Sequence, residues 1–206
     1  MTQVLINNEP VNTEFETSTT VNDLVTLILN DVATEDEVIS SIKFNGRVLS
    51  IDEEDQCLVL PVDTFNDIDF TLINSLNLAF DSLDDCSGYI DVVVSKIAEL
   101  SALYSQNEVR QANILFSEVV EIMDLFVQLV SKIHKTIRKS YPEKLQNNQT
   151  LQKLEIHLLS VLKALLPAKE KEDIIMLCDL LEYELVDNLT QWKIQAIPEL
   201  KQLNHD

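Results

Sequence analysis

The chain is poor in glycine and histidine, and each shortage excludes a class of function. Two glycines, Gly46 and Gly88, occur among 206 residues. Nucleotide-binding loops need several glycines so that the backbone can approach the phosphates closely, and neither a P-loop nor a dinucleotide-binding fingerprint can be written in this sequence. The three histidines have no Ser, Cys or Asp at motif spacing, so no catalytic triad is indicated.

Cysteine is also scarce, and its spacing excludes a disulfide framework. Cys57, Cys86 and Cys178 lie far apart among apolar neighbours, without a CxxC pair or a Cys/His cluster. We interpret them as small hydrophobic residues of a protein in a reducing compartment. The sequence lacks an apolar run of about 18 residues and a basic, apolar leader, and we expect a soluble, cytoplasmic protein of a bacterial type.

Basic residues are outnumbered, with 15 Lys and Arg against 35 Asp and Glu and a net charge of −20. Residues 1–73 carry two basic and fifteen acidic side chains. An acidic surface repels phosphate backbones and anionic headgroups, so we expect no nucleic-acid and no membrane partner. A basic protein surface remains compatible with this charge.

The first 73 residues have a period of two, which is typical of strands. We predict strands at residues 3–7, 11–17, 42–44, 47–51 and 68–73. A helix that is capped by Ser18, Thr19 or Thr20 should carry the apolar residues between Val21 and Leu29 and end around residues 31–34. Asn45-Gly46 accommodates positive φ and predicts a tight hairpin between the third and fourth strands. The acidic run at residues 52–55 lacks the ligand spacing of a calcium loop, and we expect a solvated loop there.

This order of elements resembles a β-grasp or ubiquitin-like domain, with the segment Lys43-Phe44-Asn45-Gly46-Arg47 at the position of a hairpin of similar character. The resemblance implies a binding module. It does not imply a conjugated modifier, because Leu72-Ile73 runs into the next helix without a diglycine terminus. The segment at residues 180–185, ahead of Trp192, is similar to uncharacterised bacterial proteins with a β-rich head and a helical bundle, which implies no defined function.

From residue 74 onward, apolar residues recur every three or four positions, which predicts helices with one buried face. The first two stripes are Leu76, Phe80, Leu83, Cys86, Ile90, Val93, Ile97, Leu100 and Tyr104, and then Val109, Ala112, Phe116, Val119, Met123, Phe126, Val130, Ile133 and Ile137. A third helix should end at Pro167, and a fourth carries Ile174, Cys178, Leu181, Leu185, Leu189 and Trp192. Gly88 lies within the span of the first stripe, and we interpret it as a point where a neighbouring backbone approaches closely rather than as a kink in the helix.

We therefore predict an α+β protein, with a β-grasp-like domain at residues 1–73 followed by an antiparallel four-helix bundle at residues 74–206. Chemistry is not indicated in either part. His134, His157 and His205 are interpreted as structural, and Glu155 and His157 are two apart, a spacing that does not support a di-iron site. We expect neither a metal nor a cofactor.

The leading functional hypothesis is a non-enzymatic interaction module or adaptor, acting as a monomer or homodimer. An alternative is a chaperone of the secretion or flagellar-export type that holds an amphipathic helix. Two further alternatives are an enzyme built on dispersed carboxylates, such as Asp179, Glu182 and Glu184, and a DNA-mimic inhibitor that uses the acidic head.

The second and fourth helices each carry a second apolar row, which indicates either a second packing neighbour or an exposed groove for a partner helix. The rows are Leu115, Ile122, Leu125 and Leu129, and Met176, Leu180 and Tyr183. Tyr183 and Trp192 are aromatic residues of the kind that anchor interfaces. The candidate partner-binding residues are Leu125, Leu129, Leu180, Tyr183 and Trp192.

Overall fold

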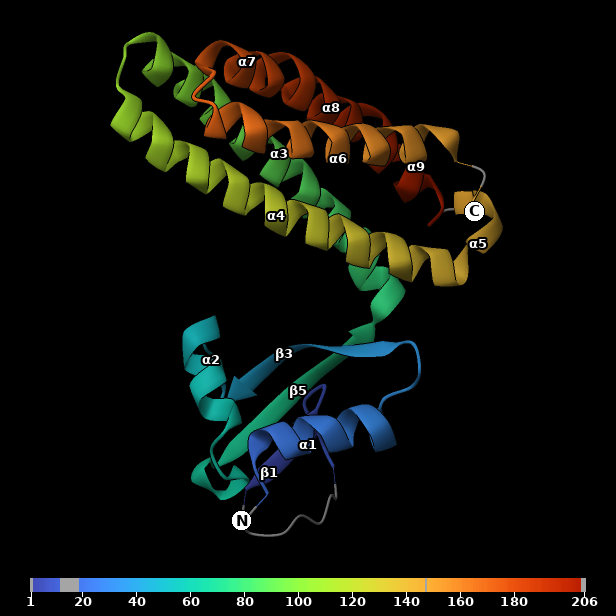
Figure 1. Ribbon diagram of the computed structural model, residues 1–206. Helices are drawn as coiled ribbons and strands as arrows, with labels where there is room; N and C mark the ends of the chain where they lie inside the picture. The colour runs from blue at the N-terminus through green and yellow to red at the C-terminus, as the bar shows by residue number, and fades with distance from the viewer. Residues whose placement is uncertain (1, 12–18, 147, 205–206) are drawn as a thin grey trace. The chain divides into compact units, whose positions relative to one another are not determined.

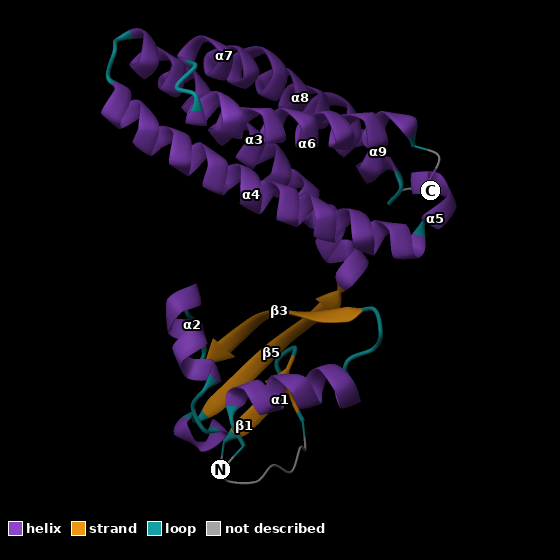
Figure 2. Cartoon of the chain, viewed as in Figure 1, coloured by secondary structure: helices purple, strands orange, loops and turns teal. Residues whose placement is uncertain are grey.

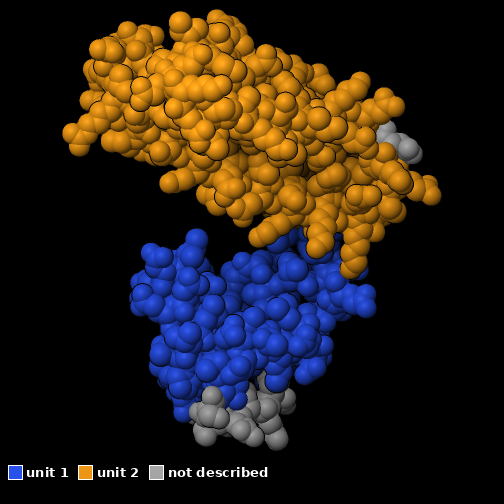
Figure 3. All heavy atoms as spheres, viewed as in Figure 1, with its two compact units in different colours: residues 1–78 blue, residues 79–206 orange. Residues whose placement is uncertain are grey.

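The computed structural model describes residues 2–11, 19–146 and 148–204. It divides into two compact units, Met1–Leu78 and Ala79–Asp206 (Figure 3). The class is α+β: a five-stranded mixed sheet lies in the first unit, and the second is built from helices (Figure 2).

The sheet of the first unit has the strand order β2-β1-β5-β3-β4. Its strands are β1 (Gln3–Ile6), β2 (Glu9–Pro10), β3 (Glu37–Phe44), β4 (Arg47–Val48) and β5 (Asp67–Asn74). β1 runs parallel to β5, and the other neighbours are antiparallel. Most of the strand predicted at residues 11–17 lies outside the described residues.

Asparagine and glycine in left-handed conformations make the two hairpin turns. Asn7 and Asn8 have φ of 54° and 66°, while Asn45 and Gly46 have φ of 50° and 73°. Positive φ at both central residues matches the twist of the flanking strands. The hairpin predicted at Asn45-Gly46 is confirmed.

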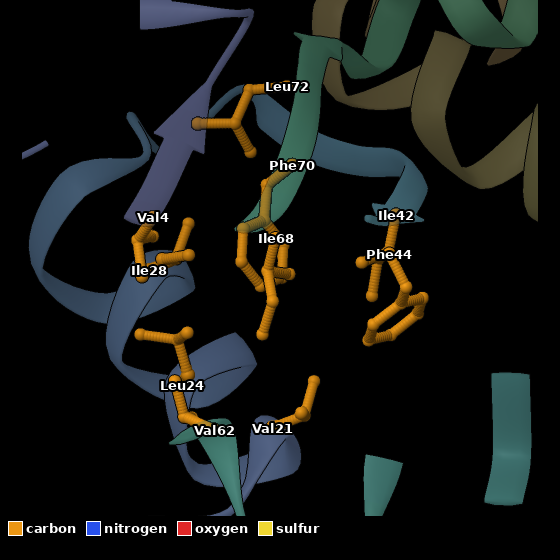
Figure 4. Packing of buried hydrophobic residues seen from close by; sticks show 10 residues of the cluster. All are labelled: Val4, Val21, Leu24, Ile28, Ile42, Phe44, Val62, Ile68, Phe70 and Leu72. Atoms are coloured by element: carbon orange, nitrogen blue, oxygen red, sulfur yellow. The ribbon is translucent and has the colours of Figure 1, made fainter. Parts of the chain in front are cut away.

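One helix covers the apolar face of the sheet, as Figure 1 shows. α1 (Val21–Leu27) continues into the π-helical segment η1 (Ile28–Val32) and begins with a capping box between Thr20 and Asp23. The core lies between helix and sheet (Figure 4) and consists of Val4, Val21, Leu24, Ile28, Ile42, Phe44, Val62, Ile68, Phe70 and Leu72.

The segment after β4 differs from the prediction. The expected strand at residues 47–51 ends at Val48, and the expected acidic loop is the helix α2 (Ile51–Leu58), followed by the short 3-10 helix η2 (Val62–Thr64). The cause is local, because the Glu53 carboxylate accepts hydrogen bonds from both the N–H and the hydroxyl of Ser50. The S-x-x-E capping pattern was present in the sequence.

The second unit holds two long helices and then shorter ones. The long helices are α3 (Ser75–Ser105), which begins within the first unit, and α4 (Val109–Ser140). After α5 (Pro142–Gln146) comes α6 (Gln149–Glu170), and the chain ends in a helical stretch made of α7 (Ile174–Asp179), η3 (Leu180–Leu185), α8 (Val186–Gln191), η4 (Trp192–Ala196) and α9 (Ile197–Gln202). None of the helices in the described ranges is both long enough and apolar enough to span a membrane.

The predicted stripes of α3 and α4 are largely confirmed. Every predicted position from Phe80 to Tyr104 is buried. In α4, Val109 is exposed and Val130 is half-buried, while Leu115 of the second row is buried.

The predicted stripe of the C-terminal stretch is buried at Leu181, Leu185, Leu189 and Trp192 and differs from the structure at its start. Ile174 and Cys178 are half-buried, and the buried positions recur every fourth residue at Leu177, Leu181, Leu185 and Leu189. In a regular α-helix such a row drifts around the axis. The wider turn of the π-helical segment η3 (i to i+5) keeps these residues on one face.

Two predictions about helix breakers are wrong. Pro167 lies inside α6, which continues to Glu170. Its missing N–H removes one hydrogen bond of the helix, and three more helical residues follow it. A Cβ built on Gly88 has nothing within 4 Å, so no neighbouring backbone approaches it.

Candidate functional site

Helix α4 packs antiparallel to both α3 and α6. Tyr104 at the end of α3 donates a hydrogen bond to Asn113 near the start of α4, at 3.1 Å. On the other side, His134 Nδ1 near the end of α4 lies 3.0 Å from Glu155 near the start of α6. The apolar residues of α4 extend beyond its buried stripe on both sides, and an apolar groove runs along each flank.

The groove between α3 and α4 has a volume of about 400 Å³. Its lining is wholly apolar or aromatic: Tyr89, Val92, Ile122, Leu125, Phe126 and Leu129. Beyond it, Lys96 of α3 and Glu118 of α4 form an ion pair of 2.7 Å between the two helices. Both residues line a separate hollow of about 300 Å³, which shares no residue with this groove and also includes Leu103, Ile114 and Leu115.

The groove between α4 and α6 is longer. Its main part has a volume of about 420 Å³ and is lined by Phe116, Val119, Val120, Met123, Asp124, Val127, Leu159, Leu162, Leu165 and Leu166. A second hollow of about 150 Å³ shares Val127 and Leu159 with it and continues to Ser131 and Glu155. From Phe116 to Ser131 the groove follows α4 for about 22 Å at the helical rise of 1.5 Å per residue.

The charged residues that line the groove between α4 and α6 are both acidic. The Asp124 carboxylate accepts a hydrogen bond from Gln128 Nε2 at 2.7 Å, and Glu155 pairs with His134. At the far end, the Lys169 ammonium lies 5.0 Å from the ring centroid of Phe116 and is hydrogen-bonded to Tyr104 and Asn113. The groove is therefore an apolar channel with two carboxylates in its lining and one ammonium group at its far end.

The structure brings together two of the five predicted partner-binding residues. Leu125, which is 65% exposed, and Leu129 line the groove between α3 and α4. Leu180 and Tyr183 belong to η3, where Tyr183 is 68% exposed, and line neither groove.

Trp192 is 1% exposed and lies at the floor of the groove between α4 and α6. It cannot project into a partner as an exposed aromatic anchor. The sequence predicted two roles for Trp192, a place in the buried stripe of the helix and an exposed anchor for a partner. Its burial agrees with the first role and excludes the second.

The exposed residues of the longer groove were not predicted. Val120, Leu159 and Leu166 are 43, 47 and 61% exposed. The sequence does contain a pattern that indicates these rows. Val120 and Val127 are seven residues apart on α4, and Leu159, Leu162 and Leu166 form a second apolar row beside the buried stripe of α6.

The histidine at residue 157 is held in a structural network. Asn188 is fully buried, and its Nδ2 donates to the Leu154 carbonyl at 3.1 Å and to His157 Nδ1 at 3.0 Å. Because Nδ1 accepts, His157 Nε2 carries the proton that is donated to Glu184 at 3.0 Å. These bonds link α6 to the C-terminal stretch and occupy both ring nitrogens.

The other reactive side chains are not assembled into a site. Asp179 and Glu182 are exposed on the C-terminal stretch. Burial raises the pKa of the Cys86 thiol to about 11, and burial also raises the pKa of Cys57 and Cys178. Within the described parts of the chain, no group of three or more His, Cys, Asp or Glu residues could hold a metal ion.

The structure thus defines a two-unit α+β protein with apolar grooves beside one long helix. The chain belongs to the family described as Domain of unknown function (DUF8042), whose model matches residues 81–195, more than half of the chain, including both grooves. Residues 2–74 match the family described as TP0873 N-terminal domain. Neither description names a ubiquitin-like domain. No curated protein and no solved structure matches the chain.

Proposed function

We propose that the protein is a non-enzymatic interaction module whose helical unit binds an amphipathic helix of a partner protein in the groove between α4 and α6. The observation that carries the proposal is the length of this groove. At about 22 Å it accommodates about four turns of helix, and an amphipathic helix is the element that buries an apolar stripe in such a groove.

Exposure along the groove supports the proposal. Leu159 and Leu166 of α6 face Val120 of α4 across the channel, and all three retain a large accessible surface. Burying a leucine side chain contributes about 1.5–3 kcal/mol, so a partner that covers these residues has a driving force for binding. The groove between α3 and α4 follows α4 over a shorter span, from Ile122 to Leu129, which is about 10 Å at 1.5 Å per residue.

The architecture of both units is consistent with a binding role. The strand order with β1 parallel to β5 supports the β-grasp interpretation of the first unit. Antiparallel packing of α3, α4, α6 and the C-terminal stretch supports a four-helix bundle, in which a wide apolar face on α4 serves two neighbours and leaves its flanks open.

A photo-activatable amino acid at Leu166 tests the proposal. In native cells it should crosslink a specific protein, which is then purified so that its affinity can be measured directly. Leu166→Glu should weaken that affinity by at least about tenfold, because a charge is placed in a desolvated contact. Far-UV circular dichroism verifies that the variant is folded.

Leu125→Glu is the matched control. It makes the same substitution at similar exposure, 65% against 61%, but in the groove between α3 and α4, and it should leave the affinity unchanged. A loss with Leu125→Glu and none with Leu166→Glu would assign binding to the other groove. A crosslinker at Ile175, 79% exposed on α7, that yields the same products as one at Leu166 would contradict a specific site.

A further inference from the structure

The charges in the groove between α4 and α6 specify the kind of helix that fits it. Asp124 lines the main part and Glu155 lines the adjoining hollow, and no basic side chain lines either of them among the described residues. Glu155 already has His134 as a partner. Asp124 has a neutral hydrogen-bond donor, Gln128, and no ion pair with any described residue.

A carboxylate beside an apolar channel is tolerated while water reaches it. When a helix covers the channel, Asp124 loses part of its hydration, and its charge must be compensated to avoid a penalty. A partner that brings a cation to this point supplies the compensation, and an acidic partner adds repulsion. The net charge of −20 favours a basic partner over the whole surface as well.

We infer that the occupant of this groove is a basic amphipathic helix, with a Lys or Arg placed beside its apolar stripe so that the cation pairs with Asp124. This inference rests on the proposed function and adds the chemistry of the partner. Lys163, one turn from both Leu159 and Leu166 on α6, does not line the groove. Of the two acidic residues in the lining, Glu155 of α6 is paired with His134, so the charge that selects the partner is that of Asp124 on α4.

Synthetic peptides of about 16 residues, which match about four helical turns, provide the probe. One peptide carries a leucine stripe with a central lysine beside it, and a second has glutamate in place of that lysine. The full-length chain is titrated with each peptide. Binding is followed by peptide fluorescence anisotropy, and emission of Trp192, the chain's one tryptophan, reports occupancy because its ring lies at the groove floor.

We expect the lysine peptide to bind more tightly than the glutamate peptide, and Asp124→Lys to reverse the order, by a factor of about three to five in each case, as for a partly exposed ion pair. Glu121→Lys is the matched control. Glu121 is exposed on α4 and lines neither groove, and the variant changes the net charge by the same amount. It should preserve the wild-type order.

Equal effects of Asp124→Lys and Glu121→Lys would overturn the inference, since they would show that general charge alone determines the preference. The inference would also be overturned if the Asp124→Lys variant still bound the lysine peptide more tightly than the glutamate peptide. The proposed function fails by a different result, in which Leu166→Glu has no effect on either peptide. If Leu166→Glu abolishes peptide binding while Asp124→Lys leaves the order of the two peptides unchanged, the groove is the binding site and the preference for a basic helix is refuted.

Discussion

The indole ring of Trp192 meets the ring of Phe126 edge-on, with centroids 6.1 Å apart and planes at 87°. Phe126 lines the groove between α3 and α4, and Trp192 lines the groove between α4 and α6. The pair therefore forms a wall shared by both grooves. Edge-to-face aromatic packing is favourable and directional, so it holds the two rings of this shared wall in a defined arrangement.

Truncating the tryptophan should destabilise the helical unit strongly. We expect Trp192→Ala to lower the free energy of unfolding by about 3–5 kcal/mol, the usual cost of removing a large buried aromatic. Urea unfolding followed by circular dichroism at 222 nm measures it. Trp192→Phe should cost much less, because it keeps an aromatic ring and removes an indole N–H that has no partner among the described residues. Equal losses in the two variants would contradict this account.

Replacing Gly88 by alanine should stabilise the protein. It is exposed within α3, its φ is not positive, and a Cβ there meets nothing within 4 Å. Gly88→Ala removes the backbone entropy cost of glycine in a helix and should raise the free energy of unfolding by about 1 kcal/mol. The thermal midpoint measures the change. A lower midpoint would reveal a conformational requirement for glycine at this position.

The start of α1 should be sensitive to acid. The Asp23 carboxylate accepts hydrogen bonds from the hydroxyl and the N–H of Thr20 at 2.7 and 3.0 Å, which lower its pKa below the ordinary 3.8. A lowered pKa means that the contribution to stability is complete well above 3.8 and is lost as the pH falls through the folded value. Titration of the Asp23 carboxyl by NMR checks this, and in Thr20→Val the pKa should rise toward 3.8. An unchanged pKa in that variant would exclude the hydroxyl as a cause.

Cys86 should be inert in the folded protein. It is fully buried, and burial raises its pKa to about 11, so almost no thiolate exists at neutral pH. We expect an aromatic disulfide reagent to titrate all three thiols in denaturant and to leave Cys86 unmodified in the native state. Mass spectrometry of labelled peptides assigns the sites. Labelling of Cys86 as fast as the half-buried Cys57 would indicate that α3 opens readily.

Local patterns were sufficient to predict most elements. The stripes of α3 and α4 persist over many turns, and their burial follows from helical periodicity alone. The hairpin at Asn45-Gly46 follows from the need for positive φ. The missed helix α2 was also local, because Ser50 and Glu53 carry a capping pattern that the acidic run concealed.

The candidate site depended on contacts that periodicity does not contain. The sequence determined that α4 has more apolar surface than one stripe, since the spacing of Leu125, Leu129 and Val120 on a helix is fixed by its geometry. Only the tertiary structure decided which of these rows stay open, because that depends on where α3 and α6 lie against α4. It also placed Trp192 in the core and left Leu166 exposed: burial is a property of neighbours brought together by folding, and one helix's spacing specifies its faces but not what covers them.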